Sequence, residues 1–164
     1  MRLFKLVALF AALTVVAAAA ARADSVLRSG ASERNFVAFL LPAAGGPGHG
    51  FGLVVFRQPE DADKVVFLDV GVLNLAPNHS YLLQRATDST VDDVCTGTNW
   101  LTLGRGPAPQ AITTNALGFG VAHLFRDLAS VPTGTRLDIH FRVIDAVSSA
   151  VVLTSTCHQF TVNP

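Results

Sequence analysis

The order of apolar and polar residues predicts a chain of short β-strands. Its strongest stretch runs from Lys64 to Thr87, KVVFLDVGVLNLAPNHSYLLQRAT, and reads as one strand, a turn at 76–78 and a second strand that opens on Ser80 and Tyr81. The first strand is rich in β-branched and aromatic residues, which suit a pleated surface. Because it is apolar at nearly every position, with Asp69 as the interruption, we expect it to be covered on both faces.

Alternating residues between Arg136 and Asp145 (RLDIHFRVID) give the clearest strand signal. In a strand, successive side chains point to opposite faces of the sheet. The alternation therefore predicts a core face with Leu137, Ile139, Phe141 and Val143, and a water face with Arg136, Asp138, His140 and Arg142.

A second alternating stretch lies between Leu117 and Arg126 (LGFGVAHLFR). A short helix from Ala122 to Ala129 also fits the spacing of its apolar residues. As a strand, it has one mainly apolar face that we expect to point inward, made of Leu117, Phe119, Val121, His123 and Phe125.

Further strands are predicted at 36–41, 51–57, 98–103 and 150–162, with turns rich in Gly, Pro and Asn between them. The glycine-rich segment 43–50 is interpreted as a connection, because it lacks the Gly-Lys-Ser/Thr ending and the helix of a phosphate-binding loop. These strands number eight or nine, and no long helix is predicted. The pattern is typical of a single all-β domain, either an antiparallel β-sandwich or a Greek-key barrel.

The first 23 residues have the features of a secretory signal peptide. Arg2 and Lys5 form a basic start, residues 6–21 are almost entirely apolar, and Ala21-Arg22-Ala23 offers a small-x-small cleavage site. We expect cleavage before Asp24, which makes 24–164 the mature domain. The protein is then secreted or periplasmic, with no membrane span after cleavage.

Charge excludes one class of partner. Without the three basic residues of the signal, nine basic residues remain against twelve acidic ones, a net charge of −3. A chain of this charge has no basic surplus to hold the phosphates of a nucleic acid. We therefore expect no nucleic-acid partner.

Two cysteines, Cys95 and Cys157, are predicted to form a disulfide, because an exported chain meets an oxidising environment. They lie too far apart in sequence for a CxxC redox motif. The alternative is a pair of buried free thiols. A bridge would tie the region after Tyr81 to the last strand.

Leu75-x-Pro77-x-x-x-Tyr81 resembles the corner of fibronectin type III and other immunoglobulin-like modules, in which a Leu-x-Pro turn leads to a strand that opens on tyrosine. The resemblance implies that the Tyr81 side chain anchors this turn through a backbone hydrogen bond. It covers seven residues and supports an immunoglobulin-like fold class.

Five histidines (His49, His79, His123, His140 and His158) raise the question of a metal site. A secreted Greek-key barrel of the copper-zinc superoxide dismutase type carries a His-x-His pair, and this chain has none. If the strands that carry His123 and His140 form a hairpin, their rings lie on opposite sides of the sheet and cannot share an ion. We expect neither a metal nor a cofactor.

Acidic loops offer an alternative, since clustered carboxylates are what calcium requires. The candidates are Glu60-Asp61-x-Asp63 and Asp92-Asp93 with Asp88, although their spacing matches no EF-hand. Catalysis has little support, because no Gly-x-Ser-x-Gly elbow is present and paired cysteines are not nucleophiles.

These observations favour a secreted, non-catalytic binding or structural domain. Its partner is an unknown protein, glycan or small apolar ligand. The alternative is a small secreted enzyme or metal-binding protein with an unrecognised site. The two differ in one feature: an enzyme needs titratable groups that meet in a cleft, whereas a binding domain needs an exposed apolar or aromatic face.

Overall fold

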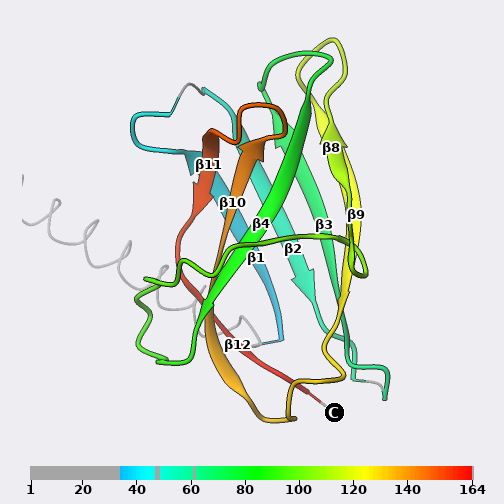
Figure 1. Cartoon of the computed structure of the whole chain (residues 1–164), viewed down its shortest axis with the longest axis vertical. Helices are drawn as coiled ribbons and strands as arrows, with labels where there is room; N and C mark the ends of the chain where they lie inside the picture. Colours follow the sequence, from blue (N-terminus) through cyan, green and yellow to red (C-terminus); the bar gives the residue numbers. More distant parts are fainter. Residues whose placement is uncertain (1–33, 47–48, 61, 164) are drawn as a thin grey trace, which may run out of the picture. The chain divides into compact units, whose positions relative to one another are not determined.

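A computed structural model describes residues 34–46, 49–60 and 62–163 (Figure 1). The described residues belong to one compact unit and contain strands but no helix. The strands are β1 (Asn35–Pro42), β2 (Phe51–Arg57), β3 (Val65–Leu73), β4 (Ser80–Asp88), β5 (Leu101–Thr102), β6 (Gly104–Arg105), β7 (Ala108–Pro109), β8 (Ala111–Thr113), β9 (Gly120–Asp127), β10 (Arg136–Asp145), β11 (Val151–Ser155) and β12 (His158–Thr161).

These strands form one sheet that nearly closes into a barrel. Its order is β5-β4-β10-β11-β1-β2-β3-β9-β6-β7, with β8 on β4 and β12 on β10. All pairs are antiparallel except β6 with β9. β4 and β9 lie at the two sides of the seam where the barrel closes. The seam is bridged by β8, which pairs with β4 and approaches β9 through Thr114 and Gly120, and by the segment 103–106, which crosses from β4 to β9 (Figure 1).

The all-β prediction is confirmed, and the predicted strands differ in detail. The structure has twelve strands in a mixed sheet, because the predicted loop after Leu103 contains the short β6 and β7. The predicted closing strand is two strands, with Thr156 and Cys157 between them. This division follows from the length of β10, whose first half pairs with β12 and whose second half pairs with β11.

Alternate residues of the long strands fill the barrel. The Phe36 ring stacks on Phe56 with centroids 4.7 Å apart, and Phe160 meets Phe56 edge-on at 4.8 Å. Such aromatic contacts add to the stabilisation from burial alone. The largest fully buried side chains include Phe56, Phe141, Leu40, Leu68, Leu83 and Ile112.

The expectation that the central strand is covered on both faces is wrong. β3 alternates in burial: Val66, Leu68, Val70 and Val72 are buried, whereas Phe67 and Leu73 are exposed. Burial is one-sided because β3 belongs to a single curved sheet, whose inner face alone meets the barrel core.

The predicted inward face of β9 is also wrong. The stretch is a strand rather than a helix, but its inward residues are Gly120, Ala122 and Leu124. His123 is 81% exposed on the outer side. The helical alternative fails because β9 pairs along its whole length with β3.

On β10 the inward face is as predicted, and the outer face is not. Ile139, Phe141 and Val143 are buried in the barrel. On the opposite side Asp138, which we expected to face water, has no exposed surface. The reason is that the connection from β4 to β5, residues 89–100, folds over the outside of β10.

Several contacts hold this connection in place. Asp138 accepts hydrogen bonds from the N–H groups of Asp92 and Asp93, both at 2.9 Å. The Trp100 ring lies against His140, with centroids 4.7 Å apart, and under the guanidinium of Arg142, whose Cζ is 4.0 Å from the ring centroid. We call residues 89–100 the covering segment.

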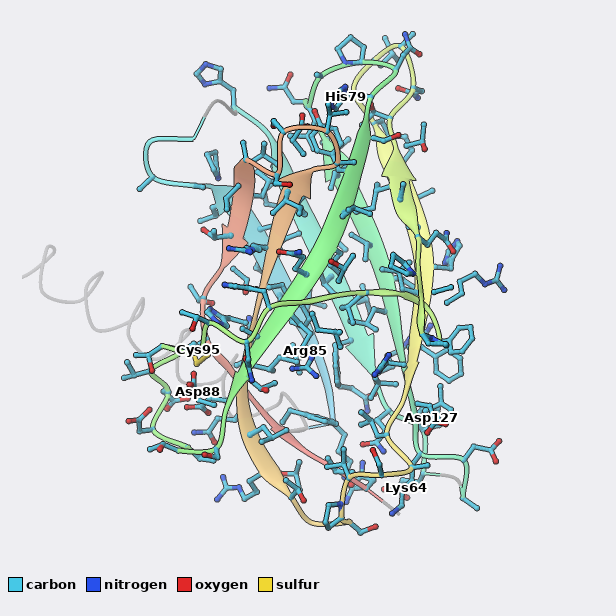
Figure 2. All side chains as sticks on the ribbon, in the orientation of Figure 1. Lys64, His79, Arg85, Asp88, Cys95 and Asp127 are labelled. Atoms are coloured by element: carbon cyan, nitrogen blue, oxygen red, sulfur yellow. A yellow bond between two sulfur atoms is a disulfide. The ribbon has the colours of Figure 1, made fainter. Side chains whose placement is uncertain are left out.

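The predicted disulfide is confirmed. Cys95, in the covering segment, is bonded to Cys157, and their Cα atoms are 5.3 Å apart. The bridge joins the covering segment to the break between β11 and β12. Figure 2 shows Cys95 near Asp88, at the end of β4.

The predicted signal peptide, 1–23, lies outside the described residues. Within the described part of the chain, no helix has the length and hydrophobicity to cross a membrane.

Candidate functional site

Large apolar side chains lie exposed on the outer side of β1, β2, β3 and β9. The most exposed at the centre is Phe39, at 57%. Sequence reasoning expected the central strand to be covered on both faces and Phe119 and Val121 to point inward, and it did not locate this surface. We call it the outer apolar face, and it consists of Val37, Phe39, Leu41, Phe51, Phe67, Leu73, Phe119 and Val121.

Strand pairing makes most of these side chains contiguous. Phe39 is paired with Leu53 across β1 and β2, and their neighbours in the same row are Gly71 and Val121. The rings of Phe39 and Phe51 lie 6.1 Å apart. Residues in one row across neighbouring strands are about 5 Å apart, so the exposed groups other than Phe67 form one surface. Phe67 lies one row beyond Asp69 and His123.

The extent of this face is unusual for a protein surface. Eight side chains, each at least 36% exposed, give an area on the order of 600 Å² if large side chains have about 150–250 Å² each. The largest patch on a typical monomer is about 300–600 Å² and is often functional. The face is thus at the upper end of that range.

A charged group of three residues lies within the face, between Phe67 and the row that contains Phe39 and Val121. Asp69 Oδ2 accepts a hydrogen bond from Arg57 Nη2 at 2.6 Å, and Asp69 Oδ1 is 2.7 Å from His123 Nδ1. The bond with His123 is the largest influence on the pKa of Asp69 and lowers it below its usual value. Desolvation opposes this shift, and the charge and hydrogen bond of Arg57 add to the lowering. These three side chains satisfy one another and leave little net charge.

This trio does not have the composition of a hydrolytic site. Val55 of β2 is paired with Asp69 in the same row. On the outer side of β9, His123 lies between Val121 and Phe125. None of these is a nucleophile. A carboxylate–imidazole pair activates a hydroxyl or thiol only when that group lies within hydrogen-bond reach of the imidazole.

A second imidazole–carboxylate pair lies next to the start of β4. His79 Nε2 is 2.6 Å from Asp145 Oδ2. The N–H groups of Ser148 and Val147 bond to Asp145 Oδ1 and lower the pKa of Asp145 to about 2, with smaller contributions from the bond with His79 and then from the Ser148 side chain. The carboxylate therefore stands between the imidazole and the hydroxyl, whereas hydroxyl activation requires the imidazole in the middle. The group stabilises the turn between β10 and β11.

The histidines do not gather. Among the described residues, no three His, Cys, Asp or Glu side chains lie close enough together to hold a metal ion. The hairpin considered for His123 and His140 does not form, because β9 pairs with β3 and β10 pairs with β4. His158 stacks on Phe36 at 4.7 Å inside the barrel, and burial lowers its pKa.

The carboxylates considered for calcium hold the covering segment instead. Asp88 Oδ2 accepts the N–H groups of Thr96 and Gly97, both at 2.9 Å, and Asp92 Oδ1 accepts the N–H of Val94. Asp61, in the other acidic loop, lies outside the described residues. These oxygens act as caps on backbone N–H groups.

The turn at Leu75, Pro77 and Tyr81 contains the hydrogen bond that the resemblance implies. The hydroxyl oxygen of Tyr81 accepts the N–H of Ala76 at 3.0 Å, while its ring is buried. Leu75 is buried and Pro77 exposed. The bond joins the start of β4 to the start of the preceding turn.

A pocket opens into the barrel along the seam between β4 and β9. It has a volume of about 80 Å³ and mostly apolar walls. Two arginines, Arg85 of β4 and Arg126 of β9, line it, and Figure 2 shows Arg85 extending from β4 toward β9. Sequence reasoning missed both, although each is in phase with inward residues: Arg85 follows Leu83 by two positions, and Arg126 follows Leu124 by two.

Comparison with protein-family models, curated proteins and solved structures found no match to this chain.

Proposed function

We propose that this protein is a non-catalytic binding domain that acts through its outer apolar face. The observation that carries the proposal is the exposure of four phenylalanines on one side of the sheet: Phe39, Phe51 and Phe119 lie together, and Phe67 lies beyond the charged group. An exposed aromatic surface is the feature that separates a binding domain from an enzyme. The occupant that we propose for this face is a second copy of the chain.

The area supports this occupant. A face on the order of 600 Å² per copy buries about 1,200 Å² in a dimer, which is the lower limit of a standard protein interface. We therefore expect a reversible dimer with a dissociation constant of about 1–100 µM. Two sheets can pack face to face in this way about 10 Å apart.

The charge of the face also supports it. In a dimer with twofold symmetry the same surface meets itself, so a net charge on the surface would repel its copy. Arg57, Asp69 and His123 are satisfied within one copy. Among the described residues, Arg57 of this face is paired with Asp69, so its charge is not available to attract anionic lipid.

Location and fold likeness belong to the same proposal. The Cys95–Cys157 disulfide supports a secreted or periplasmic protein, outside the reducing cytosol. N-terminal sequencing of exported protein tests this, since we expect the chain to begin at Asp24.

The hydrogen bond that the Tyr81 hydroxyl accepts from the N–H of Ala76 supports a local likeness to the corner of immunoglobulin-like modules.

Sedimentation velocity of the purified protein, from about 1 to about 200 µM, tests the dimer. Replacing Phe39 and Leu73 together with Thr keeps the preference for a strand and removes apolar area from the centre of the face. We expect at least a tenfold weaker dimer. The control is Val147→Thr, because Val147 is 84% exposed in the β10–β11 turn, away from the face.

A monomer throughout the concentration range contradicts the proposed occupant. A dimer that the Phe39→Thr/Leu73→Thr variant does not weaken contradicts the proposed face. Both substituted side chains are already about half exposed, so we expect the variant to keep the denaturation midpoint of the wild type, which shows that the fold is intact.

A further inference from the structure

We infer that the seam pocket is a binding site for a small amphiphilic carboxylate, whose apolar part enters the barrel and whose carboxylate lies between Arg85 and Arg126. This site lies inside the barrel, whereas the outer apolar face lies on the other side of the sheet. The inference therefore does not depend on the proposed dimer.

The pocket has an apolar interior and one charged side. Apart from Arg85 and Arg126, its polar lining is the side chain of Thr87. A site with apolar walls and a few polar groups that converge at one place is typical of small-ligand binding. The apolar walls come from both sides of the seam and from the core, and they include Phe56, Leu68, Leu103, Leu128, Phe141 and Phe160.

Both arginines point toward the interior. Arg85 is paired across the sheet with the buried Phe141, and Arg126 with the buried Val66. Paired positions in neighbouring strands point to the same face. Two cations thus occupy positions that apolar residues normally fill in a barrel.

Within the described residues, neither arginine forms an ion pair. Arg85 Nη1 donates a hydrogen bond to the Thr87 hydroxyl at 3.1 Å, and no carboxylate of the described residues forms a salt bridge with Arg85 or Arg126. Burial, and then the charge of Arg126, lower the pKa of Arg85. Desolvated like charges destabilise a fold unless an opposite charge compensates them.

The missing opposite charge points to an anion as ligand. A guanidinium presents parallel N–H donors that match the two oxygens of a carboxylate. The walls favour an apolar body over a bare inorganic anion, which would stay hydrated on every side. The pocket volume of about 80 Å³ restricts that body to a short chain or a single ring.

A route of entry adjoins the pocket. Arg126 also lines a second, more open hollow of about 350 Å³, together with Gly106, Pro107 and Ser130. The carboxylate of Asp127, which lies in this hollow, accepts the N–H of Ala129 at 2.6 Å. Arg126 therefore lines both the outer hollow and the inner pocket.

Isothermal titration calorimetry with hexanoate tests the site, with hexan-1-ol and hexylamine as ligands of the same apolar body and different head groups. We expect hexanoate to bind with a dissociation constant of about 1 mM or tighter, and at least tenfold tighter than either comparison. Acetate and inorganic phosphate separate a bare anion site from an amphiphile site. Tighter binding of phosphate than of hexanoate, or no saturation with hexanoate, overturns the inference.

Arg85→Met and Arg126→Met remove one charge each and keep a long apolar side chain. We expect each to weaken hexanoate binding at least tenfold, and to raise the thermal midpoint of the ligand-free protein because a repulsion is removed. The control is Arg105→Met, an exposed residue of β6 near the same seam, which we expect to change neither quantity. Lower midpoints for Arg85→Met and Arg126→Met with unchanged hexanoate binding would instead indicate a structural role.

Discussion

The outer positions of β10 carry Asp138, His140 and Arg142, and the covering segment lies over all three. The outer positions of β1 carry Val37, Phe39 and Leu41, which are exposed. Polar side chains are therefore covered on one part of the barrel, while apolar side chains are exposed on another. Hydrophobicity by itself did not decide which surface the chain covers.

The connections explain this difference. β4 and β5 are joined by the long covering segment, which backbone N–H bonds to Asp88 and Asp138 and the disulfide hold against the barrel. The connections from β1 to β2 (43–50) and from β2 to β3 (58–64) are short and end in neighbouring strands. They have no length to fold back over the sheet, so we expect a second molecule to cover the outer apolar face.

The largest expected effect comes from removal of the disulfide, which helps to hold the covering segment over the outer side of β10. The bridge closes a loop with a sequence separation of 62 residues, and its loss costs about 4 kcal/mol in the chain-entropy model. We expect reduction to lower the thermal midpoint and to expose Trp100, seen as a red shift of its fluorescence. The far-UV β signature should survive just below the new midpoint. Two alkylatable thiols in unfolded, unreduced protein would contradict the bridge itself.

Asp138→Ala tests the second attachment of the covering segment. It leaves the N–H groups of Asp92 and Asp93 without their acceptor, which we expect to cost about 2 kcal/mol in chemical denaturation. Asp138→Asn is the matched control, because its amide oxygen can still accept one of these bonds, and it should lose less. Equal midpoints for wild type and Asp138→Ala would show that the carboxylate does not hold the segment.

Tyr81→Phe tests the corner at the other end of β4. The substitution keeps the buried ring and removes the hydroxyl that accepts the N–H of Ala76. We expect a loss of about 1 kcal/mol, smaller than that of Asp138→Ala because one neutral hydrogen bond is lost. An unchanged denaturation midpoint would exclude the anchoring role.

His158 adds a small pH dependence. Burial lowers its pKa in the folded state, so the unfolded chain binds the proton more readily. The contribution to stability is complete above about pH 6.5, the unfolded pKa, and is lost as the pH falls through that value toward the folded pKa. His158→Phe, which keeps an aromatic ring against Phe36, should show a shallower fall in midpoint from about pH 7.5 to about pH 5.5. Equal slopes would contradict this.

Local patterns predicted the features that depend on neighbouring residues. The strand at 136–145 and its core face follow from alternation, the bond of Tyr81 from a short motif, and the disulfide from cysteine count and export. To predict each of these features, it is not necessary to know which strands lie side by side.

The misplaced features depend on long-range pairing. In β9 both alternate faces are largely apolar, so periodicity finds the strand but cannot say which face meets the core, and the larger Phe119 and Val121 turned out to be outside. The strand at 36–41 is also apolar on both alternate faces, so the pattern did not show that Phe39 lies outside. Arg85 and Arg126 meet because β4 and β9 form the seam, and no local pattern shows that two strands so distant in sequence lie opposite each other.

Hydroxyl-radical footprinting with mass spectrometry tests the central claim, that a second copy covers the outer apolar face. Phe39, Phe51, Phe67 and Phe119 should be oxidised readily in dilute protein and be protected at a concentration well above the dissociation constant. Barrel phenylalanines such as Phe56 should stay protected in both samples, because they are buried within one copy. Equal oxidation of the four exposed rings at both concentrations would contradict the account.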